Sequence, residues 1–250
     1  MDRLRQRSLE QHGLRSFDFD RMRDQAEAPG NDMLSEENIA AWRLCAPSLR
    51  DAELSDGETL YRQGEEPGFL YCLMRGVVRL SHVAESGAQI TLAIAGAGDL
   101  FGRVSPGRAS AHAASAIGDA CVLMFDPSDV ARLLAKSPSF SSFLSAGLEA
   151  SRERAERRLI DRQTKTVAAR LIETLGELAL AFGAPCPHGY SLEIRLTQQD
   201  IADLVHASRP VVTRIMNDLR RRGALDYRRD LICVNHVALQ SLAKEKPADL

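Results

Sequence analysis

The stretch LTQQDIADLVHASRPVVTRIMNDLRRR, residues 196–222, is the segment from which the organisation of the chain can be worked out. It predicts two short helices joined by a tight turn. Thr197 can cap the first helix, because its hydroxyl oxygen can accept an otherwise unpaired backbone N–H one turn further on. Asp200 adds negative charge to that first turn. Ser208 is expected to cap the second helix, with Pro210 in its first turn, where the missing N–H costs nothing.

The second helix, expected over residues 209–222, has two chemically different faces. One face is apolar with helical spacing and carries Val211, Ile215, Met216 and Leu219. The opposite face is polar and rich in arginine. A helix-turn-helix inserts such a second helix into the DNA major groove, N-terminus first, where Arg can bind guanine through two hydrogen bonds and Thr can contact a thymine methyl group. The alternative interpretation is an ordinary helical hairpin with a solvated basic face.

The residues after this helix complete a recognisable unit. Gly223 is expected to end the helix. Residues 224–234 read as a small hairpin, or wing, with a turn near Arg229 and Asp230, and Asn235 can cap a final short helix. The side chains expected to face bases are Arg209, Pro210, Thr213, Arg214 and Asn217. The residues expected to reach phosphates are Thr197, Gln198, Ser208, Arg220, Arg221, Arg228 and Arg229.

Charge and composition limit what the whole chain can do. The chain has 250 residues, which suggests two modest domains. Its formal net charge of −2 excludes a general polyanion binder, but residues 195–230 carry eight arginines against five aspartates, a local charge of +3. No signal-peptide core is evident and no run approaches the about 20 apolar residues of a membrane helix, so we expect no membrane partner and a cytoplasmic protein. The five cysteines are widely spaced, which predicts free thiols and no iron–sulfur cluster.

Residues 52–125 change character, with short apolar runs separated by glycines. Strands are predicted over residues 60–61, 69–74, 77–83, 89–94 and 120–125. Many short strands at regular spacing indicate a sandwich or barrel. His82 and His112 are isolated and lack neighbouring carboxylates, so no metal site is expected. Cys186 and His188 lie in what reads as a rigid Pro- and Gly-containing loop without a third orienting group.

Helical patterns flank this region. Ser35 is expected to cap a helix over residues 36–45, and Ser128 one ending at residue 134. A long helix is predicted from Ser137 to residue 165, and an amphipathic helix over residues 166–182. The long helix carries a seam with nearly the 3.5-residue period of a coiled coil; a solvated face is the alternative. The seam residues are Leu144, Leu148, Ser151, Ala155 and Leu159.

Two sets of motifs resemble one known family. LTQQDIADLV (196–205) followed by SRPVVTRIMNDLRRRGAL (208–225) resembles the winged-helix domain of the cyclic-AMP receptor protein/fumarate-nitrate reductase regulator (Crp/Fnr) family. GETLYRQGEE (57–66), LYCLMRGVVRL (70–80) and GDLFG (98–102) resemble the cyclic-nucleotide-binding β-roll of the same family. The resemblance covers about residues 53–242. In the family a Glu often follows the first Arg of the recognition helix; here it is Pro210, so a different half-site is expected.

The resemblance implies an α+β fold with a defined domain order. A polar extension (1–35) precedes a jelly-roll-type β-roll (36–135), a dimerisation helix (136–165) and a winged helix-turn-helix (166–250). It also implies a homodimeric transcription regulator that binds a pseudo-palindromic site on double-stranded DNA, with RNA polymerase as a further partner. No Ser-His-Asp, metal or paired-carboxylate arrangement points to an enzyme.

The resemblance also locates an effector pocket, in which this chain departs from cyclic-AMP binders. Where the family has a ribose-binding Glu, this chain has Arg103; the phosphate-binding Arg is absent, with Arg108 the nearest substitute. The C-terminal half is most similar to the global nitrogen-control branch, which implies 2-oxoglutarate as effector. The expected pocket residues are Phe101, Gly102, Arg103, Val104, Arg108, Arg152 and Glu156. The sequence thus predicts a small anionic effector, 2-oxoglutarate or a nucleotide other than cyclic AMP; the alternative is an effector-independent regulator whose β-roll is only a dimer and polymerase-contact scaffold.

Overall fold

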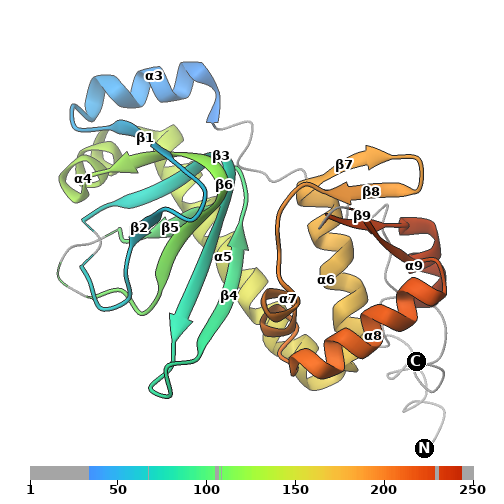
Figure 1. Ribbon diagram of the computed structural model, residues 1–250. Coiled ribbons are helices and arrows are strands. Elements are labelled where there is room, and N and C mark those ends of the chain that lie inside the picture. The colour runs from blue at the N-terminus through green and yellow to red at the C-terminus, as the bar shows by residue number, and fades with distance from the viewer. Residues whose placement is uncertain (1–33, 67, 105–106, 108, 229–230, 244–250) are drawn as a thin grey trace, which may run out of the picture.

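The computed structural model describes the chain except residues 1–33, 67, 105–106, 108, 229–230 and 244–250. Almost all of the expected N-terminal extension therefore lies outside the described residues, as do Arg108, Arg229 and the side chain of Arg228. Figure 1 shows a β-rich lobe, a smaller lobe of helices and short strands, and one long helix that runs behind the β-rich lobe.

The β-rich lobe is an antiparallel β-roll preceded by helix α3 (Glu36–Cys45). Ser35 caps α3 as expected, accepting a hydrogen bond from the Asn38 N–H at 3.3 Å. The strands are β1 (Arg50–Leu54), β2 (Thr59–Tyr61), β3 (Leu70–Val83), β4 (Gln89–Ala95), β5 (Leu100–Gly102) and β6 (Ala113–Phe125). Their order is β1-β6-β3-β4, with β2 paired to β6 and β5 to β3. The α+β fold class with an N-terminal β-roll is confirmed.

Two strand predictions were wrong. Residues 69–74 and 77–83 were expected to form separate strands, but they belong to the single strand β3. Gly76 has a φ of +86°, and the register with β6 shifts on both sides of Arg75. Gly76 is therefore an irregularity inside a strand, where a Cβ would overlap the Asp119 carbonyl oxygen. Strand β6 also begins earlier than expected, because its first half (AASAIGD) consists mainly of small residues and has no apolar run.

Three helices connect the two lobes: α4 (Pro127–Lys136), α5 (Pro138–Thr164) and α6 (Val167–Phe182). Helix α5 begins where it was expected, with Ser137 as its cap. The cap of α4 is Asp126 rather than Ser128; the Asp126 carboxylate accepts from the Ser128 N–H at 2.8 Å. Only residues 165–166 separate α5 from α6. None of the described helices is long and apolar enough to cross a membrane.

The smaller lobe is a winged helix-turn-helix. After α6 come β7 (Gly183–Cys186), β8 (Gly189–Leu192), α7 (Gln198–Leu204), α8 (Arg209–Arg221), β9 (Leu225–Arg228), β10 (Leu231–Val234) and α9 (His236–Ala243). The sheet order is β7-β8-β10-β9, which confirms the wing of β9 and β10. The rigid loop expected near Cys186 is instead the hairpin β7–β8. Gly189 allows this pairing because its φ is +137° and any Cβ would overlap the Val234 carbonyl oxygen.

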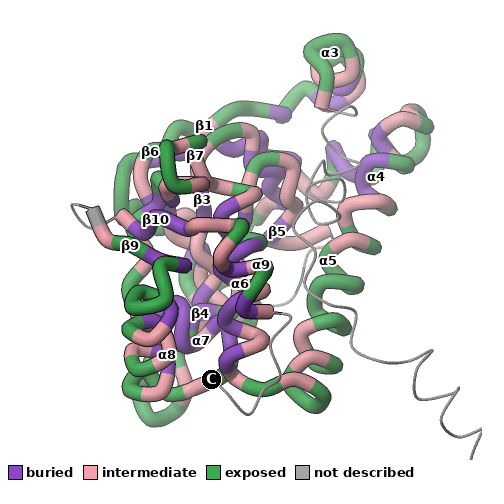
Figure 2. The backbone as a smooth tube through the Cα atoms, turned by 90° about the vertical axis from the view of Figure 1, so that its right-hand side faces the viewer, coloured by how far each residue is buried: buried purple, intermediate pink, exposed green. Residues whose placement is uncertain are grey.

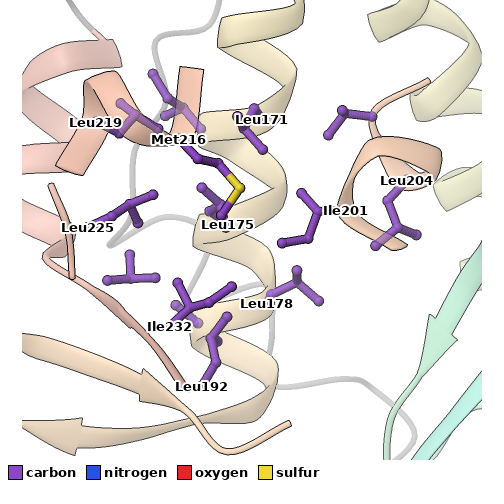
Figure 3. Close-up of a cluster of buried hydrophobic side chains, with 14 of the residues drawn as sticks. Leu171, Leu175, Leu178, Leu192, Ile201, Leu204, Met216, Leu219, Leu225 and Ile232 are labelled. Carbon is purple, nitrogen blue, oxygen red and sulfur yellow. The ribbon is translucent and has the colours of Figure 1, made fainter. Parts of the chain in front are cut away.

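Each lobe has its own apolar core. In the β-rich lobe, Trp42 is fully buried against Phe125, Phe140 and Phe143, between the helices and the sheet. Figure 3 shows the core of the smaller lobe, where side chains from α6, α7, α8 and the sheet converge. This second core holds the helix-turn-helix on α6.

The second half of α5 is largely exposed, as Figure 2 shows by its green colour. Leu148 is 48% exposed and Leu159 is 64% exposed, and Ser151 and Ala155 are exposed as well. Leu144 differs from these seam residues. It is only 4% exposed and belongs to the cluster around Trp42. Its assignment to the intersubunit seam is therefore corrected, because its surface is already covered within the chain.

Candidate functional site

The first helix of the helix-turn-helix begins with reciprocal capping. Thr197 Oγ1 accepts from the Asp200 N–H at 3.1 Å, and Asp200 Oδ2 accepts from the Thr197 N–H at 2.8 Å. Two backbone groups that lack helical partners are thereby satisfied. The helix ends at Leu204. In the turn that follows, His206 has a φ of +51°, which is uncommon for a residue other than glycine. This tight turn sets the direction of α8.

Ser208 occupies the N-cap position of α8, but its hydroxyl makes no capping hydrogen bond. A capping side chain bonds the N–H of the second or third helical residue. The second residue is Pro210, which has no N–H, and the N–H of the third, Val211, bonds the Ser208 backbone oxygen at 3.0 Å. The predicted side-chain cap is therefore wrong, and the Ser208 hydroxyl stays at the surface.

The inner face of α8 holds the helix in place. Val212, Met216 and Leu219 are fully buried, and Figure 3 shows Met216 pointing into the space between α8 and Leu175 of α6. Burial of such a side chain contributes about 1.5–3 kcal/mol. The orientation of the outer face is therefore set by a packed core.

The outer face of α8 forms an open, shallow hollow. It brings together all five residues expected to face bases, with two of those expected to reach phosphates. The lining residues are Arg209, Pro210, Thr213, Arg214, Asn217, Arg220 and Arg221. The helix pattern alone was enough to find this surface.

The arginines on this face differ in how far they are already engaged. Arg221 and Arg222 both pair with Asp218, at 2.9 Å and 3.0 Å. Within the described part of the chain, Arg209 and Arg214 have no hydrogen bond or ion pair. Their guanidinium groups can therefore bind a ligand without first breaking an internal contact. Sequence reasoning did not separate these two groups of arginines.

Gln198 and Thr213 contact each other across the helix-turn-helix. Thr213 Oγ1 donates to Gln198 Oε1 at 2.6 Å. The contact fixes Thr213 on the recognition face and uses the carbonyl oxygen of Gln198, so that its amide N–H groups remain as donors. Arg220 lies over the ring of the wing residue Tyr227, with 5.6 Å from guanidinium carbon to ring centroid.

Phe101 and Gly102, two of the residues expected to form the effector pocket, lie at a stack of aromatic rings. Phe101 is 6% exposed and stacks on Tyr71, which stacks on Tyr61; both centroid separations are 5.6 Å. Gly102 has a φ of +87°, and a Cβ there would come within 2.6 Å of the Tyr71 ring. Arg103 donates to the Ala109 carbonyl oxygen at 3.1 Å, and Val104 is partly buried at the edge of the core around Trp42. Among the described residues, these rings thus belong to a buried apolar cluster inside the β-roll.

A histidine, His112, contacts the Tyr61 end of this stack, and His82 lies near it. His112 Nε2 is 2.9 Å from Tyr61 Oη, and His82 Nδ1 is 2.8 Å from the Ala111 oxygen. Burial, with a smaller contribution from the charge of His82, lowers the pKa of His112 below its usual value. Among the residues that the structure describes, no three His, Cys, Asp or Glu side chains gather as metal ligands would.

The two α5 residues assigned to the pocket pair with each other. Arg152 Nη1 is 2.5 Å from Glu156 Oε1, and both side chains are exposed. The α5 arginines that contact the β-roll are instead Arg154, 2.6 Å from Asp99, and Arg158, which donates to the Leu92 carbonyl oxygen at 2.7 Å. Sequence reasoning missed these contacts. Their spacing of four residues, one helical turn, was the only available signal.

Comparison with known proteins agrees with both lobes. Residues 52–137 match the family model described as cyclic nucleotide-binding domain, and residues 169–242 match the Crp-like helix-turn-helix domain. The chain is 29% identical to the global nitrogen regulator of Synechococcus elongatus over 196 aligned residues. These residues cover 76% of this chain and 88% of that protein. The global nitrogen regulator of Synechocystis sp. is 30% identical over 187 residues, which covers 73% and 83%.

A solved structure gives the same result. A CRP-family transcriptional regulator from Thermus thermophilus superimposes with a TM-score of 0.66 at 26% identity, covering 78% of this chain and 97% of that one. These relatives are transcription regulators rather than enzymes. On its β-roll, its winged helix-turn-helix and these similarities, the chain belongs to the Crp/Fnr family of transcription regulators and carries the family's DNA-binding domain.

Proposed function

We propose that this regulator binds a pseudo-palindromic DNA site as a homodimer, with α8 of each subunit in the major groove. The observation that supports this best is the outer face of α8, where Arg209 and Arg214 are free of internal partners among the described residues. Arg209, Arg214, Thr213, Asn217 and Pro210 are then the residues that contact bases. Thr197, Gln198, Ser208 and the arginines of the helix end and wing contact phosphates.

We assign dimerisation to the exposed half of α5. The apolar seam there, with Leu148 and Leu159 about half exposed or more, is a surface that a second copy would cover. Leu159→Glu is expected to shift the protein to monomer in sedimentation equilibrium. The matched control is Leu44→Glu on α3, a residue 89% exposed, which is expected to leave the dimer intact. A dimer that survives Leu159→Glu would count against this seam.

We propose that the β-roll acts as a packed scaffold and that the regulator binds DNA without an effector. Tyr61, Tyr71 and Phe101 stack on one another inside the roll, and Arg103, which stands where the family has a Glu, donates to the Ala109 carbonyl oxygen. The competing hypothesis is control by a small anion such as 2-oxoglutarate. The similarity to proteins named global nitrogen regulators is the reason to include this anion in the test. As a transcription regulator, the protein is further proposed to contact RNA polymerase and to act in the cytoplasm.

The test is selection from a randomised DNA duplex library with the purified full-length chain, alone and with cyclic nucleotides or 2-oxoglutarate. We expect a palindromic motif without any additive. A motif that appears only with one additive would overturn the scaffold role and identify the effector. The Arg209→Ala/Arg214→Ala double variant is the control, because it should enrich no motif. Failure of the unmutated protein to enrich any motif would contradict sequence-specific binding itself.

A further inference from the structure

Strand β4, at the edge of the β-roll, has an irregular stretch that contacts both the helix-turn-helix and the long helix α5. Its pairing with β3 passes from Leu80–Ala93 to Ser81–Thr91, so Leu92 is left without a partner in the register. Such a β-bulge redirects backbone groups and bends the strand. The Thr91 N–H bonds Asp203 Oδ2 of α7 at 2.8 Å, and the Leu92 carbonyl oxygen accepts from Arg158 of α5 at 2.7 Å. One bulge therefore contacts the helix-turn-helix and the long helix together.

The side chain of Thr91 makes a second contact with α7. Its hydroxyl donates to Asp200 Oδ1 at 2.8 Å, and Arg79 Nε lies 3.3 Å from the same oxygen. Thr91 and Asp200 are each only 4% exposed. The other oxygen of Asp200 caps α7 through Thr197. A single buried carboxylate thus links the start of the helix-turn-helix to the β-roll.

Apolar packing surrounds these hydrogen bonds. Val77 and Ile117 of the β-roll belong to the same buried cluster as the core of the smaller lobe, and Ile94 packs against it. Gly96 lies so close to Phe182 that a Cβ would come within 2.9 Å of its ring. Figure 1 shows α7 next to β4, and the outer face of α8 remains open. The contact therefore restrains the helix-turn-helix without covering its recognition face.

The covalent connection alone cannot provide this restraint. Between α5 and α6 lie only Lys165 and Thr166, but their φ and ψ angles allow many orientations. A dimer that reads two half-sites must hold its recognition helices about one DNA turn apart. We propose that Thr91 forms a clamp with Asp200, through its hydroxyl, and with Asp203, through its N–H. This clamp fixes each helix-turn-helix to its β-roll and long helix and sets the half-site spacing which the dimer accepts. Thr91 and Asp203 are thus positioning residues. The proposal rests on the proposed function.

The test measures affinity for duplexes whose half-sites are separated by the preferred spacing, or by one or two base pairs more or fewer. Thr91→Val and Asp203→Ala each remove one clamp contact. Both are expected to lower affinity at the preferred spacing on the order of tenfold, since a buried group loses its partner, and to flatten the spacing dependence. Affinity for a single half-site should stay unchanged, which a misfolded helix-turn-helix would not allow.

Matched variants separate the clamp from general effects on folding. Thr91→Ser keeps the hydroxyl and should retain the wild-type spacing preference. Thr59→Val makes the same change as Thr91→Val at an exposed strand residue and should also behave as wild type. If Thr91→Val and Asp203→Ala keep the wild-type preference, or bind more tightly at the preferred spacing, the clamp is wrong. If the wild-type protein binds no duplex at any spacing, the proposed function fails, and the clamp with it.

Discussion

The outer face of α8 keeps arginine side chains available for a ligand, whereas in the interior of the β-roll aromatic side chains are buried against one another. On α8, Arg209 and Arg214 are unpaired within the described residues and border an open hollow. In the β-roll, Phe101 and Tyr71 are stacked and buried, and Arg103 bonds the chain itself. The family resemblance predicts a binding site in both regions. The two regions differ in how many of the predicted binding side chains already contact other parts of the chain.

The largest expected effect tests whether the aromatic stack is structural. Phe101→Ala should lower the free energy of unfolding by about 3–5 kcal/mol, because it leaves a cavity in a packed interior. Urea denaturation followed by circular dichroism measures the change. Phe69→Ala is the control, since Phe69 is only partly buried and should cost less. A loss below about 1 kcal/mol for Phe101→Ala would mean that the β-roll interior is looser than described.

The next effect tests the other region. Arg209→Ala should weaken binding to the preferred DNA site by about 1–3 kcal/mol and relax specificity at one base position. Fluorescence anisotropy with duplexes substituted at each position measures both. Arg221→Ala, which removes an arginine already paired with Asp218, should have a smaller effect without a change of specificity. Unchanged binding by Arg209→Ala would refute α8 as the recognition helix.

A smaller effect compares the starts of the two helices in the DNA-binding domain. Thr197→Ala should cost about 1 kcal/mol of stability, because it removes the capping hydrogen bond of α7. Ser208→Ala should cost almost nothing, since the Ser208 side chain makes no capping bond. Thermal unfolding of the two variants and the wild type measures the difference. Equal losses would show that capping does not distinguish the two helices.

The smallest expected effect concerns pH and the β-roll. Burial lowers the pKa of His112 in the folded protein below the 6.5 of an unperturbed histidine. The unfolded chain therefore takes up a proton first as the pH falls, so stability from neutral His112 is present above about pH 6.5 and lost below it. His112→Gln should reduce that loss in denaturation series between pH 7.5 and about pH 5. The wild-type protein, measured over the same pH range, is the reference.

Sequence predictions were right where a feature depends on residues within one helical turn, and wrong where a neighbouring group competes for the same hydrogen bond. Ser35, Thr197 and Asn235 were correctly expected to cap helices, because capping depends on residues within one turn. Ser128 and Ser208 were wrongly given the same role, since a neighbouring Asp126 in one case and Pro210 in the other decide which oxygen bonds the helix. Short-range patterns thus predict elements well but do not always identify the competing group.

The predicted sites follow the same rule. The residues predicted for the recognition face lie together on the outer face of α8, because they share one helix and helical spacing brings them together. The expected effector pocket combined residues from a loop and from α5, and there Arg152 and Glu156 pair with each other while Arg154 and Arg158 contact the β-roll. Which side of α5 faces the β-roll is set by packing against the sheet, and the sequence pattern of the helix does not show it.

The sequence by itself determined the fold class, the helix-turn-helix and the residues on its outer face, because hydrophobic period, caps and turn residues act over a few positions. Only the tertiary structure decided which arginines stay unpaired, that Leu144 is covered within the chain, and that aromatic rings stack against one another in the β-roll. It alone joined Thr91 to Asp200 and Asp203, which are more than a hundred residues apart. Such contacts depend on how preformed elements pack against one another, and no local pattern encodes that geometry.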